Sequence, residues 1–304
     1  MNDYFAFIIG ILSAGIGGEF FVRGVVGLAH WARISPGIIG ATVAAFATSS
    51  PELSVAVNSA LEGQPQISLG DALGSNILNV ALILGLALIV SGIQTPRDRT
   101  KRDFLTALLT PVVIGILCLD GLLSRIDGLI LLSIFFVWII LVVIEVRRQQ
   151  SAADEVLGEH RNWLAIIFCV VGFACLIVAG HLIVVGGKGI AISFGIDEFV
   201  TGATIVAIGT SVPELATTMI SKMRGHEEVG LGTILGSNIF NSLWVVGIAA
   251  TIFPISVSWR EVSVALIFGL VTVALTFPTS RGVIERRRGV LLVALYVVYV
   301  ATIL

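Results

Sequence analysis

The chain has 304 residues, of which 56% are apolar and 12% are charged, and its formal net charge is -2 at pH 7. Soluble domains carry roughly a quarter charged residues, and the mean hydropathy of +1.02 excludes a soluble enzyme or binding domain. The charged residues gather between apolar stretches long enough to cross about 30 Å of hydrocarbon at ~1.5 Å per residue. The sequence therefore predicts an integral membrane protein.

The apolar stretches predict ten transmembrane helices in chain order. These cover residues 4–26, 36–60, 67–92, 104–122, 126–146, 163–186, 198–221, 229–254, 258–279 and 289–304. The first stretch follows Asn2 and Asp3 instead of a basic leader, so we expect it to stay in the mature chain. Cys118, Cys169 and Cys175 lie in or beside apolar stretches and are expected to be small core residues.

Lys and Arg are distributed unevenly between alternate loops. Fifteen of the eighteen fall on one set of loops, and only Arg125, Lys188 and Arg260 fall on the other. Because positively charged loops are retained in the cytoplasm, the larger set is expected to be cytoplasmic. The sequence predicts a multi-pass protein of the plasma (inner) membrane with both termini extracytoplasmic. Its expected partners are the lipid bilayer and inorganic cations; nothing indicates nucleic acid, and no protein partner is inferable.

The chain contains an internal repeat. Residues 40–79 match residues 202–241 at a fixed offset of 162 without a gap, and nineteen of the forty positions are identical. The identities include Thr, Ser, Pro, Glu and Asn, so general hydrophobicity does not explain them. One repeat contains five predicted helices, an odd number, so the second copy enters the membrane from the opposite side.

The predicted fold class follows from this repeat. It is an all-α integral membrane protein with ten transmembrane helices in two inverted-topology repeats of five helices. We expect residues 1–146 to form the first repeat, 147–162 a short cytoplasmic linker and 163–304 the second, inverted repeat. The linker is too short and polar to be a separate regulatory domain.

Glu52 and Glu214 are repeat mates inside predicted membrane helices, and each follows a proline. An ionisable residue at such depth is costly and usually functional. Proline breaks the helix, so we expect carbonyl groups near Ala47 and Gly209 to lose their partners and to face a cation beside the carboxylates. Further oxygen donors nearby are Thr48, Ser49, Ser75, Asn76 and Asn79 with their mates Thr210, Ser211, Ser237, Asn238 and Asn241.

This cluster contains only hard oxygen donors and neither Cys nor His, which favours Ca2+ over Zn2+ or Cu+. Two glutamates carry two negative charges, and moving them uncompensated through hydrocarbon is costly. An empty site should therefore not change its access, which predicts obligatory exchange and not a passive channel. An intramembrane hydrolase is disfavoured because the sequence has neither GxSxG nor HExxH. No cofactor is expected.

At these residues the chain resembles the sodium/calcium exchanger family of the cation/calcium exchanger superfamily. The resemblance rests on GATVAAFATSSPE with GDALGSNILN and on GATIVAIGTSVPE with GTILGSNIFN, which match the family's two alpha repeats. It implies that Glu52, Glu214 and the backbone carbonyls of Thr48 and Thr210 hold Ca2+. The implied Na+ ligands besides these glutamates are Ala45, Ser49 and Ser75 on the cytoplasmic side and Ala207, Ser211 and Ser237 on the external side, with Asn79 and Asn241 flanking the centre. The glycine-rich first and sixth helices would be the gate.

The resemblance implies a secondary antiporter that exchanges Ca2+ for Na+ by alternating access, not an enzyme. A Ca2+/H+ antiporter, or an exchanger of another divalent cation, stays open, although the Ca2+/H+ family usually has GNxxE where this chain has TSSPE and TSVPE. Ala47 departs from the family's usual Gly. Asn241 is Asp in potassium-dependent members, which argues against K+. Asp71, opposite Thr233, is an additional carboxylate and a possible accessory residue. Glu19 and Arg23 are expected to form an ion pair one helical turn apart.

Overall fold

A computed structural model of the protein describes residues 3–61, 63, 65–95, 97–153, 163–193, 207–257 and 259–303. Part of the predicted linker, residues 154–162, and the beginning of the second repeat copy, residues 202–206, lie outside the described residues. The side chain of Ala207, a predicted Na+ ligand, also lies outside them.

The first half of the chain is helical, with short π-helical segments (η) inserted into two of its long helices. Its elements are α1 (Asp3–Ala32), α2 (Pro36–Ile39), η1 (Gly40–Ala44), α3 (Ala45–Thr48), α4 (Ser50–Leu61), α5 (Pro65–Ile77), η2 (Leu78–Leu84), α6 (Gly85–Val90), β1 (Ile93–Gln94), α7 (Arg97–Leu117), β2 (Leu122–Leu123) and α8 (Arg125–Ala153).

The second half repeats this order where it is described. Its elements are α9 (Trp163–Ser193), α11 (Ala207–Thr210), α12 (Val212–Met223), α13 (Glu227–Ile239), η4 (Phe240–Val245), α14 (Val246–Ile252), β3 (Ile255–Ser256), α15 (Trp259–Leu275), β4 (Val283–Ile284) and α16 (Arg286–Ile303). The π-helical segments η2 and η4 begin at Leu78 and Phe240, which are repeat mates (78 + 162 = 240).

The prediction of a helical membrane protein is confirmed. Five helices of the described residues are long and apolar enough to cross a membrane, or six if the bent pair at 36–48 and 50–58 is one span. Several helices extend beyond their predicted ends: α1 continues to Ala32, α7 begins at Arg97, and α8 continues to Ala153 through the first part of the predicted linker. Arg and Gln in that part of α8 are good helix formers, which explains its extension.

The fold also contains two short antiparallel ribbons, which an all-α prediction did not include. β1 pairs with β4, with Ile93 opposite Ile284, and β2 pairs with β3, with Leu122 opposite Ser256. Each ribbon therefore joins a strand of one half to a strand of the other. The repeat offset carries β1 onto β3 (93 + 162 = 255) and Leu122 of β2 onto Ile284 of β4 (122 + 162 = 284), so the two ribbons correspond to each other, with pairings that differ by one residue.

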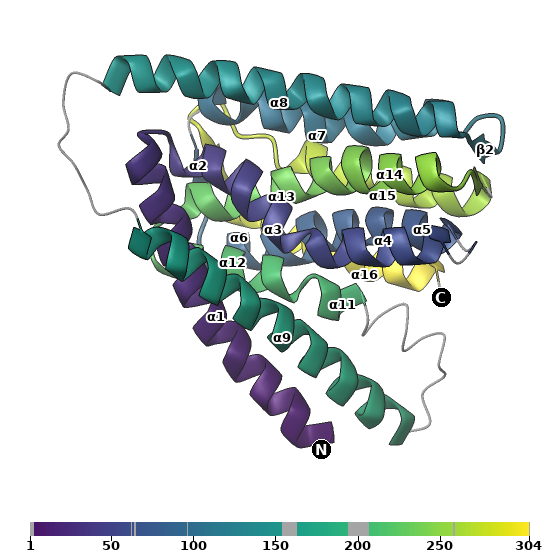
Figure 1. The fold of residues 1–304 in the computed structure, drawn as a ribbon, viewed down its shortest axis with the longest axis horizontal. Helices are drawn as coiled ribbons and strands as arrows, with labels where there is room; N and C mark the ends of the chain where they lie inside the picture. The colour runs from purple at the N-terminus through teal and green to yellow at the C-terminus, as the bar shows by residue number, and fades with distance from the viewer. Residues whose placement is uncertain are drawn as a thin grey trace.

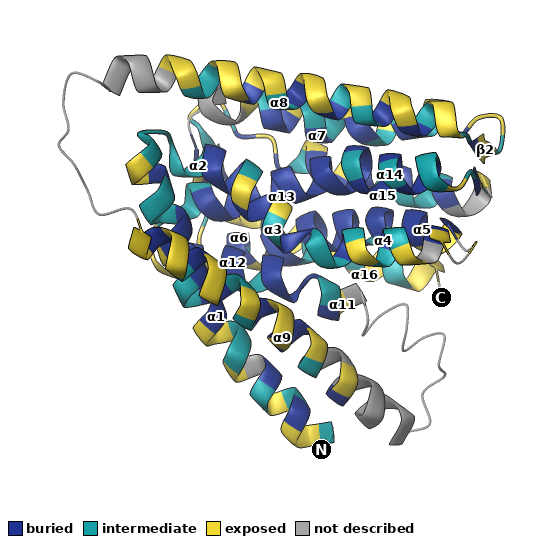
Figure 2. Cartoon of the chain, viewed as in Figure 1, coloured by how far each residue is buried: buried dark blue, intermediate teal, exposed yellow. Residues whose placement is uncertain are grey.

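The helices are arranged around a buried centre made by α5, α13 and their continuations (Figure 1). In the most apolar part of the helix at 227–252, 89% of the residues are buried, whereas in the most apolar part of α8 only 22% are buried. Figure 2 shows the same division, with exposed positions along α1, α8 and α9. Exposed side chains on α8 such as Phe136 and Ile140 are large and apolar, as expected for contact with lipid.

α1 and α9 lie side by side along one flank of this centre (Figure 1). Their approach depends on glycines. A Cβ at Gly17 would lie 2.8 Å from Cys175 Cβ, and one at Gly172 would lie 2.7 Å from the Phe21 Cα atom. Small residues allow helix backbones to approach closely in a membrane. The two predicted gate helices thus form one packed pair.

Candidate cation site

Both predicted helix breaks are present, and they fall two residues before each proline. Ser49 has φ -85° and ψ 7°, and its repeat mate Ser211 has φ -91° and ψ 9°. In the first half, the helical pieces on either side of Ser49 are bent by 41°. A proline ring clashes with the carbonyl of the fourth preceding residue, which displaces the break upstream of the proline.

The carbonyl of Ala47, beside the first break, accepts a hydrogen bond at 2.6 Å from the Ser50 hydroxyl. Val212 is the repeat mate of Ser50 and carries no hydroxyl, so the second half has no equivalent cap. The first break is therefore closed by a side chain that the repeat does not share.

The bends place Glu52 and Glu214 in the first turns of α4 and α12, where neither side chain is exposed to solvent. Among the described residues, no Lys or Arg forms an ion pair with either carboxylate. Ser49, three residues before Glu52, donates a hydrogen bond to Glu214 at 3.4 Å, so the two repeats bring the segments that carry the carboxylates together. A buried carboxylate without a counter-ion is costly unless a cation or a proton neutralises it.

Glu214 is surrounded by hydroxyl donors from both halves. Ser237 donates to its Oε1 atom at 3.2 Å, and Ser49 donates to the same atom at 3.4 Å. The hydroxyl oxygens of Thr48 and Ser237 lie 3.3 Å apart and share a hydrogen bond. One oxygen of Glu214 is thus held by protein donors, while Oε2 has no partner in the described part of the chain.

Glu52 is in a different environment. Within the described ranges, neither of its carboxylate oxygens accepts a hydrogen bond. The mates of the two Glu214 donors are Ser211 and Ser75, whose buried hydroxyls also have no partner in the part of the chain that the structure describes. The site therefore consists of a hydrogen-bonded half at Glu214 and an open half at Glu52.

Most other predicted ligands share this buried environment. Thr48, Asn79, Asn241 and Ala45 are inaccessible to solvent, and the Asn79 Oδ1 and both amide atoms of Asn241 have no partner among the described residues. Thr210 lies at the end of α11 and is partly buried. A buried polar atom without a partner is rare in folded proteins and requires an explanation. A bound ion is one such explanation for the oxygen atoms.

The donor set is that of a hard cation. The described residues contain no group of three or more His, Cys, Asp or Glu side chains able to hold a metal ion. The site instead combines two carboxylates with hydroxyl and amide oxygens, the ligands that Ca2+ and Na+ prefer to nitrogen or sulfur. The residues present fit a transported cation, and they offer no soft ligand to a transition metal.

Asp71 is a third carboxylate near this site. It is partly buried and lies on α5, which packs against α4, the helix that carries Glu52. The sequence indicated only a possible accessory residue. Asp71 thus lies on a helix next to that of Glu52, in the same half of the chain.

The predicted ion pair of Glu19 and Arg23 is present, with Nε and Oε1 2.6 Å apart. Sequence reasoning missed its second partner, Arg224, whose Nε donates to Oε2 of Glu19 at 2.9 Å. This contact ties α1 to the end of α12. Because 205 residues separate the two side chains, no local pattern could have indicated it.

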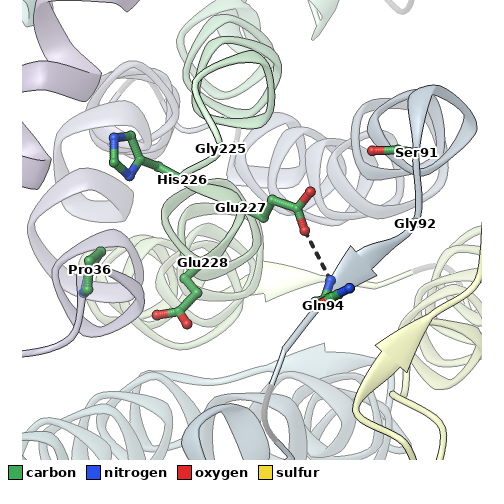
Figure 3. Close-up of a pocket in the computed structure, with 8 residues that line it drawn as sticks. All are labelled: Pro36, Ser91, Gly92, Gln94, Gly225, His226, Glu227 and Glu228. Carbon is green, nitrogen blue, oxygen red and sulfur yellow. Dashed lines mark hydrogen bonds between the residues drawn. The ribbon is translucent and has the colours of Figure 1, made fainter.

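A separate pocket with a volume of about 710 Å3 lies where the turn between α12 and α13 faces β1 (Figure 3). There, Glu227 accepts hydrogen bonds from the Gln94 backbone N–H at 3.0 Å and from Lys222 Nζ at 2.6 Å. None of the predicted ligands lines this pocket, so it is separate from the carboxylate pair.

Comparisons with known proteins identify relatives of this chain. The sodium/calcium exchanger protein family matches residues 3–144 and 164–304. The inner membrane protein YrbG of Escherichia coli (strain K12) is 34% identical over 311 aligned residues, covering 97% of this chain and 94% of that protein. Sodium/calcium exchanger MaX1 of Methanosarcina acetivorans is 24% identical over 347 residues, covering 99% of this chain and 98% of that protein.

A solved structure of the sodium-calcium exchanger NCX_Mj, soaked with Na+ and Sr2+, superposes with a TM-score of 0.84 at 29% identity, covering 99% of this chain and 98% of that one. Two buried glutamates in a set of oxygen donors, and a family match that includes both halves, lead to the same assignment. The chain belongs to the sodium/calcium exchanger protein family and is a membrane cation exchanger, not an enzyme.

Proposed function

We propose that this protein exchanges Ca2+ for Na+ across the membrane by alternating access, with both ions bound at Glu52 and Glu214. The observation that carries the proposal is the set of buried oxygen atoms, on and near these two carboxylates, that have no hydrogen-bond partner among the described residues. The proposed further ligands are Thr48, Ser49, Ser75, Asn79, Ala45 and their mates Thr210, Ser211, Ser237, Asn241 and Ala207.

The exchange follows from charge. The two carboxylates carry two negative charges in a site that is closed to solvent. One Ca2+, or several Na+, neutralises them, whereas the empty site keeps a charge that is costly to move through a medium of low dielectric constant. The protein therefore changes its access only when loaded, so the two ions are transported in turn and in opposite directions.

Na+ is the proposed coupling ion because of the hydroxyl groups. Na+ needs several oxygen ligands besides a carboxylate, and the hydroxyl oxygens of Ser75 and Ser211 are buried and without partners among the described residues. The rival is a Ca2+/H+ antiporter, in which protonation of the two glutamates replaces Na+ binding. The experiment below distinguishes the two.

The proposed topology is ten spans in two inverted halves, residues 1–146 and 163–304, with both termini extracytoplasmic. Three features support it: the helix breaks at Ser49 and Ser211, the π-helical segments at repeat-related positions, and the two ribbons that are repeat mates. The breaks and the π-helical segments follow the sequence offset of 162, and the ribbons follow it to within one residue. In repeats of this kind the two access states arise when the halves exchange conformations.

The test is uptake of radioactive Ca2+ into vesicles that contain the purified protein and are preloaded with Na+. We expect uptake to require the outward Na+ gradient and to persist with a protonophore. We expect Glu52→Gln and Glu214→Gln each to reduce uptake to background, because either variant has one negative charge too few to neutralise a divalent ion. The exposed Glu285→Gln is the matched control and should transport normally. Uptake driven by a proton gradient without Na+ would establish the rival, and normal transport by either site variant would refute the proposed site.

A further inference from the structure

Four polar side chains form a buried hydrogen-bonded chain between the two halves, beside the carboxylates. The Asn76 amide group donates to the Ser242 hydroxyl at 2.8 Å. Asn76 and Asn238 are repeat mates, and each donates from Nδ2 to the backbone carbonyl of the other, at 3.4 and 3.2 Å. Asn79 donates from its own Nδ2 to the Asn238 Oδ1 atom at 3.5 Å, a long contact that completes the chain.

The reciprocal pair locates the axis that relates the repeats. A pair of mates that donate to each other must lie close to that axis, and here both are at least nine-tenths buried. Their amide nitrogens and backbone carbonyls are engaged with each other. Asn76 and Asn238 are therefore suited to joining α5 to α13, and the Asn238 Oδ1 is committed to Asn79 instead of to an ion.

The chain has a consequence for Asn79, a proposed ligand. Because its Nδ2 is held by Asn238, its carbonyl oxygen is turned away from that contact, and this oxygen is buried and without a partner in the described residues. An amide fixed in this way presents an acceptor to a cation and cannot rotate to present its N–H groups, which would repel the ion. The orientation of Asn79 is thus determined by residues outside the proposed ligand set.

The second half lacks the equivalent arrangement. Both amide atoms of Asn241, the mate of Asn79, are unpartnered, and so is the Asn76 Oδ1 that would hold it, as far as the structure describes the chain. The sequence contributes to this difference, because the mate of Ser242 is Val80, which has no hydroxyl to anchor Asn238. The two central asparagines are therefore inequivalent, one held and one free.

We propose that Ser242, Asn76 and Asn238 are positioning residues that fix Asn79 as a preorganised oxygen ligand, whereas Asn241 adjusts to the bound ion. This inference rests on the proposed function, because it assumes that cations bind between the two glutamates. Fixing a ligand before binding lowers the entropy that must be lost when the ion arrives. The sequence motif GSN would then supply positioning as well as helix packing.

The test is equilibrium binding of radioactive Ca2+ to the purified protein, with the transport rate and the unfolding temperature measured alongside. Ser242→Ala should raise the half-saturating Ca2+ concentration about fivefold, the order of one lost hydrogen bond, while the maximal rate and the unfolding temperature stay near wild type. Ser242→Thr keeps the hydroxyl and should restore wild-type binding. Asn238→Ala, which removes the acceptor of Asn79 directly, should weaken binding more than Ser242→Ala.

The matched control is Ser221→Ala, which removes an equally buried hydroxyl; among the described residues this hydroxyl donates only within its own helix, to the Thr218 carbonyl at 3.0 Å. It should leave Ca2+ binding unchanged. Equal Ca2+ binding by wild type and Ser242→Ala, or a loss that Ser242→Thr does not restore, would overturn the inference alone. Absence of Ca2+ binding by the wild-type protein would instead overturn the proposed function.

Discussion

Replacing Gly236 with alanine tests whether the close packing of α13 against η1 and α3 holds the site together. A Cβ at this position would collide first with the Ala41 carbonyl oxygen, and it would lie 2.6 Å from Ala45 Cβ and 2.7 Å from the Ala41 carbonyl carbon. Ordinary contacts begin at 3.4 Å, so the segments must separate by about 0.8 Å (3.4 - 2.6). The obstructing atoms belong to backbone or to a Cβ, and none of them can rotate away.

The magnitude follows from two opposed effects. Overpacking costs typically about 1–3 kcal/mol, and obstruction by backbone places this case near 3. Alanine in a helix gains about 1 kcal/mol over glycine, which leaves a net loss of about 2 kcal/mol. At ~2–4 °C per kcal/mol, the unfolding temperature should fall by about 5 °C. Ca2+ binding should also weaken, because η1 leads into α3 and Thr48, whose hydroxyl contacts Ser237 beside the substituted position.

The assay is thermal unfolding of the detergent-solubilised protein at one fixed heating rate, since unfolding of such proteins is often irreversible. Gly269→Ala is the matched control. Its Cβ would meet only the Pro111 Cγ atom at 3.7 Å, an ordinary contact, so its unfolding temperature should be unchanged or higher. A Gly236→Ala protein as stable as the wild type would refute the reasoning, because it would mean that α13 and η1 separate at no cost.

Two further predictions concern Asp71 and the topology. Asp71→Asn should raise the external Ca2+ concentration for half-maximal transport about two- to threefold at 0.01 M salt. The increase should be much smaller at 0.1 M salt, where charges are screened beyond ~10 Å. An unchanged concentration at both salt levels would show that Asp71 does not attract the ion, and total loss of transport would show that it is a ligand. Cysteines introduced at Asp120 and Arg224 should react with an impermeant thiol reagent from outside and from inside, respectively. Labelling of both from one side would contradict the inverted arrangement.

The carboxylate pair and its oxygen donors could be predicted from the sequence because each motif occurs twice, once in each repeat. One Pro-Glu pair in an apolar stretch is weak evidence, whereas two at a constant offset predict two halves of one site. The same offset explains what sequence could not provide. It predicts equivalent partners for Glu52 and Glu214, yet Ser237 and Ser49 donate to Glu214, whereas neither carboxylate oxygen of Glu52 has a partner among the described residues.

The remaining differences arise from contacts between distant residues or from a single substitution in one copy. Ser50 caps the Ala47 carbonyl because its side chain is short and adjacent, but this depends on the local bend. Glu19 meets Arg224 only because α1 packs against α12. The predicted ends of α7 and α8 differ from the observed ends by several residues. The predictions followed the apolar stretches, whereas in the structure both helices continue into charged residues beyond them.

The two ribbons have a consequence for how the chain is made. Ile284 of β4 follows Ile93 of β1 by 191 residues (284 - 93). At a synthesis rate of ~5–20 residues per second, β4 is therefore made about 10–40 s after β1. Strands left unpaired for so long expose N–H and C=O groups that can pair wrongly. A truncation at the end of the chain that removes β4 would therefore damage the region around Ile93, far from the deletion in sequence, and the two halves expressed separately would each be left with open strand edges.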